Sequence, residues 1–184
     1  MCVAVEGRFL QADDVAGLRA SAVRAEAGGA GAVFLAEGPL GDPVVLAAGL
    51  SASVRRVLLG VRVDLTAAGS RHPAVLAREM TSLDHVCGGR SLLCVGPPFT
   101  GATVEAVVLC RSMWRDGTAT SDGPVYPVRA AVNRPRPPGV DSPLVAVDLT
   151  AGTTSATVPP SLSGLVDLVL LPTEDPSVCR VERP

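Results

Sequence analysis

Polar side chains that could do chemistry stand where apolar runs of this sequence end. Glu37 follows the apolar run at 32–36, Asp64 follows another, and His72 precedes Pro73 at a predicted helix start. A carboxylate or an imidazole in such a place can transfer a proton or contact a polar ligand. Each can equally be a solvated group beside a turn. Whether these side chains form a functional site therefore depends on the helices and strands that position them.

Other reactive residue types form no recognisable catalytic arrangement. The sequence has no GxSxG elbow for a serine nucleophile. Gly88 and Gly89 precede an apolar run, whereas dinucleotide-binding glycines follow a strand and open a helix. Asp84 and His85 fall inside a predicted helix, and we interpret them as structural. The cysteines lack metal-ligand spacing and are interpreted as core residues in a reducing compartment: Cys2, Cys87, Cys94, Cys110 and Cys179.

The composition predicts a soluble, cytoplasmic, single-domain protein. Hydrophobic residues make up 47% of the 184 positions and aromatic residues only 3%, so Ala, Val and Leu must build the core. A net charge of −2 gives no reason to expect nucleic acid or an anionic membrane as a partner. There is no basic segment before an apolar run at the N-terminus, and no stretch reaches about 18 uninterrupted apolar residues.

Predicted helices and strands alternate along the chain. Helices are indicated by capping residues and by apolar residues three or four positions apart, and strands by short continuous apolar runs. The expected helices span about 14–27, 43–53, 73–87 and 103–115, and the expected strands are 2–5, 32–36, 57–63, 91–96, 143–149 and 165–171. Apolar strands separated by helices predict an α/β fold with a parallel sheet covered on its faces.

Two further segments have their own signals. The proline-rich stretch 118–138 is too dense in proline for a helix and is compatible with a hairpin around Asp122-Gly123. The segment from Pro172 onward is polar and is expected to be a loose tail. Within helix 73–87, Leu83 belongs to the face expected to be buried, and Gly88 ends the helix.

Five segments, in this order, resemble the bacterial luciferase-like monooxygenase superfamily of flavin- and deazaflavin-dependent (β/α)8 enzymes. They are GAVFLAEGP (31–39), DPVVLAAGLSASVRRVLLGVRV (42–63), HPAVLAREMTSLDHVCGGRSLLCVGPP (72–98), EAVVLCRSMWRDG (105–117) and DGPVYPVRAAVNRPRPPG (122–139). The resemblance implies a truncated or incomplete (β/α)8 TIM-type barrel with about six parallel strands. It would occupy residues 1–171, followed by the tail 172–184.

A barrel with six parallel strands is expected to leave two open edges, because the family's geometry closes with eight strands and about 250 residues. Open edges favour association. The resemblance therefore predicts a homodimer, or a heterodimer with a full-length homologue.

The resemblance also implies a site at the carboxyl ends of the strands. Glu37 and His72 would be catalytic, and Glu37, Asp64, Cys94 and Gly96 would contact FMN or a deazaflavin. Many members have Glu-His where this chain has Glu37 and a glycine, and the loop after strand 91–96 lacks an arginine that luciferases place near the phosphate. Cofactor binding is therefore expected to be weak or absent.

Two functions remain open from the sequence. One is a flavin-dependent oxidoreductase or monooxygenase acting on an unknown small-molecule substrate. The other is a non-catalytic flavin-binding or scaffold protein that resembles the non-fluorescent flavoprotein of luminous bacteria and could partner a complete homologue.

Overall fold

The computed structural model describes residues 5–65, 71–139, 143–150 and 157–184. Its helices are α1 (Val15–Ala27), α2 (Pro43–Leu50), α3 (Pro73–Cys87), α4 (Gly101–Asp116) and the short 3-10 turn η1 (Pro160–Leu162). Its strands are β1 (Val5–Phe9), β2 (Ala32–Ala36), β3 (Leu58–Val63), β4 (Ser91–Val95), β5 (Thr118–Ser121), β6 (Val128–Val132), β7 (Leu144–Asp148), β8 (Leu168–Pro172) and β9 (Val178–Glu182).

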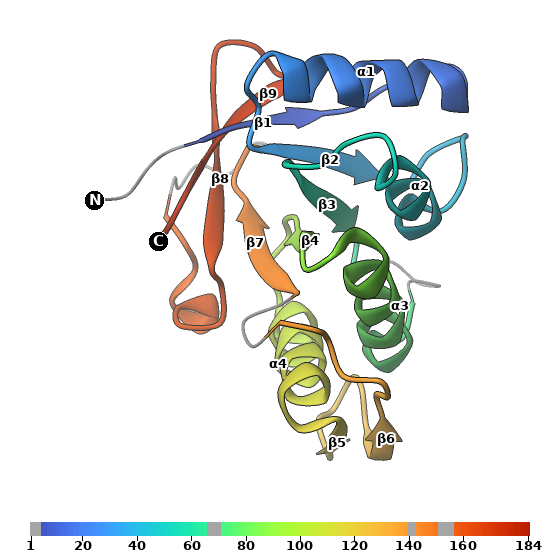
Figure 1. The fold of residues 1–184 in the computed structure, drawn as a ribbon. Helices are drawn as coiled ribbons and strands as arrows, with labels where there is room; N and C mark the ends of the chain where they lie inside the picture. Colours follow the sequence, from blue (N-terminus) through green and yellow to red (C-terminus); the bar gives the residue numbers. More distant parts are fainter. Residues whose placement is uncertain (1–4, 66–70, 140–142, 151–156) are drawn as a thin grey trace.

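Seven strands form a closed barrel in the order β1-β2-β3-β4-β7-β8-β9 (Figure 1). The six strands from β1 to β8 in that order pair in parallel, which confirms the expected parallel sheet. The seventh, β9, runs antiparallel to both of its neighbours: Cys179 pairs with Gly7 of β1, and Val181 pairs with Leu170 of β8. The molecule is thus a short (β/α) barrel that an antiparallel strand closes.

The closure by β9 contradicts two expectations from the sequence. The barrel was expected to be incomplete, with two open edges, and the segment from Pro172 was expected to be loose. Instead, β9 alternates: Cys179 and Val181 are buried inside the barrel, and Arg180 between them is exposed. That alternation is typical of a strand with one solvated face, and in only five residues it is a weak signal.

The outer faces of β1 and β9 are charged. Arg8 lies 2.7 Å from Glu6 on β1, and Arg180 lies 2.6 Å from Glu182 on β9. Glu6 and Arg180 are also register partners across the two strands. This part of the barrel wall is therefore suited to contact with water.

The barrel interior is filled by small and medium side chains around Phe34. The buried interior cluster consists of Ala32, Phe34, Leu92, Cys94, Ala146, Leu170, Cys179 and Val181. A Cβ atom at Gly60 would lie 2.3 Å from the Phe34 ring, so glycine is needed on β3 for this ring to fit. A second, larger core lies between the outside of the sheet and the helices.

The predicted hairpin is confirmed as β5 and β6, whose loop lies against the beginning of α4. Glu105 of α4 accepts hydrogen bonds from the backbone N–H groups of Val125 (3.2 Å) and Tyr126 (2.7 Å). The Tyr126 hydroxyl donates to the Leu65 carbonyl at 2.8 Å. The hairpin therefore reaches from α4 to the loop that follows β3.

Element boundaries differ from the sequence prediction in a few places. The structure describes the expected strand 2–5 only from Val5, and residues 2–4 lie outside the described residues. The expected helix 43–53 ends at Leu50, and the expected strand 165–171 begins at Leu168. In the described part of the chain, no helix has the length and apolar character needed to cross a membrane.

Helix α3 has the predicted bounds, and its predicted face is buried. Gly88 ends it with a left-handed φ of 69°.

We expect Leu83→Asp to lower the free energy of unfolding by about 3 kcal/mol or more, because this fully buried side chain would become a charge. Val86→Asp on the exposed face of α3 is the matched control. An unchanged denaturation midpoint for Leu83→Asp in circular dichroism would contradict this packing.

Candidate functional site at the barrel mouth

A cavity of ≈ 570 Å³ opens at the carboxyl ends of β1, β2, β3 and β7. Apolar side chains of Phe9, Phe34 and Leu46 form part of its wall. The Phe9 and Phe34 rings pack with their centroids 5.3 Å apart. Its charged lining residues are Asp13, Glu37, Arg62 and Asp148. The cavity therefore combines an apolar wall with a few polar groups, as small-molecule sites do.

An ion pair between Arg62 and Asp148 lies inside the barrel mouth. The Arg62 Nε donates to the Asp148 Oδ2 at 2.7 Å, and the Asp148 side chain is only 2% exposed. The other oxygen of Asp148 accepts from the Thr150 N–H at 2.8 Å and from its hydroxyl at 2.5 Å. The buried carboxylate is therefore both paired and hydrogen-bonded, as burial of a charge requires.

Gly96 gives the Arg62 guanidinium its space. A Cβ atom at position 96 would lie 2.7 Å from Nη2 of Arg62. The expected cofactor contact of Gly96 stays a prediction, and the structure shows that the absence of a Cβ atom here leaves room for the arginine.

Sequence reasoning missed both members of this pair, although a signal was present. Each is a single charged residue in an otherwise apolar strand, β3 or β7. Alternation along a strand places Arg62 on the same face as Gly60, and Asp148 on the same face as Ala146, which is inside the barrel. A charge at an inward position requires a partner, so two inward charges of opposite sign, on the strands that flank β4, were candidates to pair.

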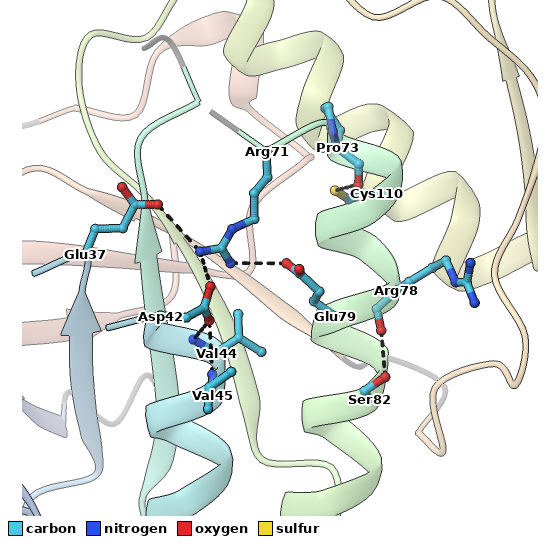
Figure 2. Close-up of polar contacts among 10 residues, drawn as sticks. All are labelled: Glu37, Asp42, Val44, Val45, Arg71, Pro73, Arg78, Glu79, Ser82 and Cys110. Atoms are coloured by element: carbon cyan, nitrogen blue, oxygen red, sulfur yellow. Dashed lines mark hydrogen bonds and ion pairs between the residues drawn. The ribbon is translucent and has the colours of Figure 1, made fainter. Parts of the chain in front are cut away.

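Glu37 lies on the rim of the cavity, beside a cluster centred on Arg71 (Figure 2). Its side chain is 60% exposed, and a Glu37 oxygen lies 3.6 Å from Nη2 of Arg71. Arg71 also pairs with Asp42 and, at 3.1 Å, with Glu79. The arginine thus ties the loop after β2 to the beginning of α2 and to α3.

His72 has a structural role at the beginning of α3. Its Nδ1 accepts a hydrogen bond from the Ala74 N–H at 3.1 Å, so the imidazole caps the helix. Its ring contacts Tyr126 edge-on, with centroids 5.6 Å apart. His72 is not among the described residues that line the cavity. The catalytic roles expected of Glu37 and His72 stay predictions.

The other two predicted cofactor contacts, Asp64 and Cys94, are not among the described residues that line the cavity. Asp64 is exposed just after β3, and Cys94 is buried within the barrel interior. A direct contact from either of them to a ligand stays a prediction.

Burial makes the described cysteines poor nucleophiles. It raises the pKa of Cys110 and of Cys179 to about 12 and the pKa of Cys94 well above the ordinary value, because a thiolate would lose its hydration. At pH 8, which is far below these pKa values, the thiols stay protonated and unreactive.

In a Cys2→Ser variant, we expect a thiol reagent to react with the four remaining cysteines only after denaturation. Rapid reaction of all four in the native protein would contradict their burial.

The chain belongs to the luciferase-like monooxygenase family, whose model matches residues 3–99, more than half of the 184 residues. No curated protein matches it.

Solved structures share the fold. EDTA monooxygenase from Chelativorans sp. BNC1 has a TM-score of 0.66 at 19% identity, over 84% of this chain and 46% of that chain. The coenzyme F420 dependent tetrahydromethanopterin reductase from Methanopyrus kandleri has a TM-score of 0.65 at 14% identity, over 79% and 50%. The oxygenating constituent of 3,6-diketocamphane monooxygenase from Pseudomonas putida, in complex with FMN, has a TM-score of 0.55 at 17% identity, over 71% and 44%. The chain therefore spans half or less of each.

Proposed function

We propose that this protein is a flavin-dependent oxidoreductase of the monooxygenase type, acting on a small molecule, and that the flavin ring binds in the mouth cavity. The observation that carries the proposal is the cavity itself. It lies at the carboxyl ends of parallel strands, where barrels of this kind keep their sites, and ≈ 570 Å³ is within the usual size range of ligand pockets. Membership of the family supports the reaction type.

The residues that line the mouth cavity fit an uncharged ring system. Phe9, Phe34 and Leu46 supply an apolar wall, and the Arg62 guanidinium beside it can donate hydrogen bonds to polar atoms at the edge of a ring. A bound flavin would supply the redox chemistry. This chain would hold the ring against the apolar wall and limit its contact with water. The exposed carboxylate of Glu37 at the rim would contact the ligand.

Flavin binding can be tested by quenching of riboflavin fluorescence on titration with the protein. We expect dissociation constants in the micromolar range or weaker. Gly38 lines the cavity, and a Cβ atom at this position would meet nothing within 4 Å. A leucine there should occupy space that the ring needs, so Gly38→Leu should weaken binding about tenfold or more.

Gly49→Leu is the matched control, because Gly49 lies on the exposed side of α2 with equally open space at its Cβ position. Equal binding by the two variants would contradict the location of the site, and a lack of binding by the unaltered protein would overturn the proposed function. Binding without oxidation of any substrate would instead favour the non-catalytic alternative.

We also propose self-association, as a homodimer or as a heterodimer with a full-length homologue. Open strand edges give no support to self-association, because β9 closes the barrel. The remaining support is the exposed apolar side chains of Val45 on α2 and Val75 on α3. Light scattering coupled to gel filtration tests it, and a stable monomer of 18.7 kDa at high micromolar concentration would refute the homodimer.

A further inference from the structure

Two carboxylates line the mouth cavity near its edge, and two more lie beside one of them. We define the acidic rim as Asp13 and Glu37, which line the cavity, together with Asp42 and Glu79, which pair with Arg71 next to Glu37. Three of these surround one guanidinium, that of Arg71, as Figure 2 shows. Three carboxylates against one arginine leave this cluster with a net charge of −2, and Asp13 adds a further negative charge at the cavity wall.

The Arg62 guanidinium inside the cavity does not offset the negative charge of the acidic rim. Arg62 is paired with the buried Asp148 at 2.7 Å, so the two together add no net charge. Among the described residues that line the cavity, one arginine faces three carboxylates: Asp13, Glu37 and Asp148. The lining therefore has a net charge of −2 at neutral pH.

The two helix N-termini beside the cavity already hold carboxylates. The N-terminus of a helix attracts a phosphate through its backbone N–H groups. At α1, Asp14 accepts from the Gly17 N–H at 2.6 Å. At α2, Asp42 accepts from the N–H groups of the first turn at 2.8 and 3.1 Å. A phosphate here would have to compete with these carboxylates.

We infer that the mouth cavity selects a flavin without a phosphate group, riboflavin rather than FMN. The inference rests on the proposed function and specifies its ligand. The same ring is present in both molecules, so the difference is the phosphate, a dianion near neutral pH. Negative charges within about 10 Å repel it, and a cleft with walls of one charge sign strengthens that repulsion. The ribityl chain of riboflavin is uncharged, so these carboxylates do not repel it.

The experiment compares riboflavin and FMN on the same protein by fluorescence quenching at low ionic strength. We expect riboflavin to bind about tenfold more tightly than FMN. Raising the salt concentration from about 10 to about 150 mM should narrow this ratio, because salt screens charges at the exposed rim. The Glu37→Gln variant removes one negative charge from the acidic rim, so it should bind FMN several-fold more tightly and lower the ratio of riboflavin affinity to FMN affinity.

Glu182→Gln is the control for this change of net charge, since Glu182 lies on the outer face of β9 and pairs with Arg180. It should leave the ratio unaltered. FMN binding equal to or tighter than riboflavin binding would overturn the inference and leave the proposed function standing. A ratio that neither salt nor Glu37→Gln changes would overturn the acidic rim as its cause. Failure of both flavins to bind would overturn the proposed function, and the inference with it.

Discussion

Removing residues 174–184 should abolish the folded barrel. These residues contain β9, which contributes Cys179 and Val181 to the interior cluster and forms the ladders with both β1 and β8. Without β9, two strand edges and the apolar interior would be open to water. The loss should exceed the whole stability of a typical domain, about 5–15 kcal/mol. We expect no cooperative melting transition in circular dichroism, together with aggregation through the open edges.

The control for this truncation changes only the outward side chains of β9. The Arg180→Gln/Glu182→Gln variant removes an ion pair on the outer surface and keeps both ladders, so its melting temperature should change little. If the truncated chain melted cooperatively at the temperature of the intact protein, β9 would have no part in closing the barrel.

Replacing Arg62 with methionine should lower the free energy of unfolding by about 3 kcal/mol, because it leaves the buried Asp148 carboxylate without its cation. The Arg62→Met/Asp148→Leu double variant should regain most of that loss, because no buried charge remains. Urea unfolding of the two single variants and the double variant measures the coupling energy between the two residues. We expect more than about 1.5 kcal/mol.

The chain offers a matched surface pair for this double-mutant cycle. Arg115 and Asp116 lie 2.8 Å apart, and their side chains are 76% and 49% exposed. The same cycle on this pair should give a coupling energy below about 0.5 kcal/mol. Equal coupling energies for the two pairs would show that the pair inside the barrel is as well solvated as the surface pair.

Local sequence signals were sufficient for most of the barrel. The bounds of α3 follow from Pro73 in its first turn and from Gly88, where only a residue that tolerates a left-handed conformation ends the helix comfortably. The bounds of β2 follow from a continuous apolar run between glycine and a carboxylate. In each of these elements, interactions between residues close together in the sequence determine where the element begins and ends.

Interactions between distant segments were not predictable in the same way. β9 becomes a strand because β1 and β8 offer it two edges, and the segment alone is short and polar at alternate positions. Arg62 and Asp148 are 86 residues apart. The buried Asp84 has the structural role expected of it, and its side chain accepts hydrogen bonds from the backbone N–H and the hydroxyl of Ser91, which lies on the strand after α3. Each case depends on three-dimensional neighbours that periodicity does not identify.

The central claim is that a closed seven-strand barrel holds a flavin ring at the carboxyl ends of its parallel strands. A crystal structure of the protein soaked in riboflavin tests it most directly. We predict ring density against Phe9 and Phe34, next to Arg62, with β9 antiparallel to β1. The opposite end of the barrel has its own cavity, lined by Arg111 and Trp114. Ring density there, or a barrel left open between β8 and β1, would contradict the account.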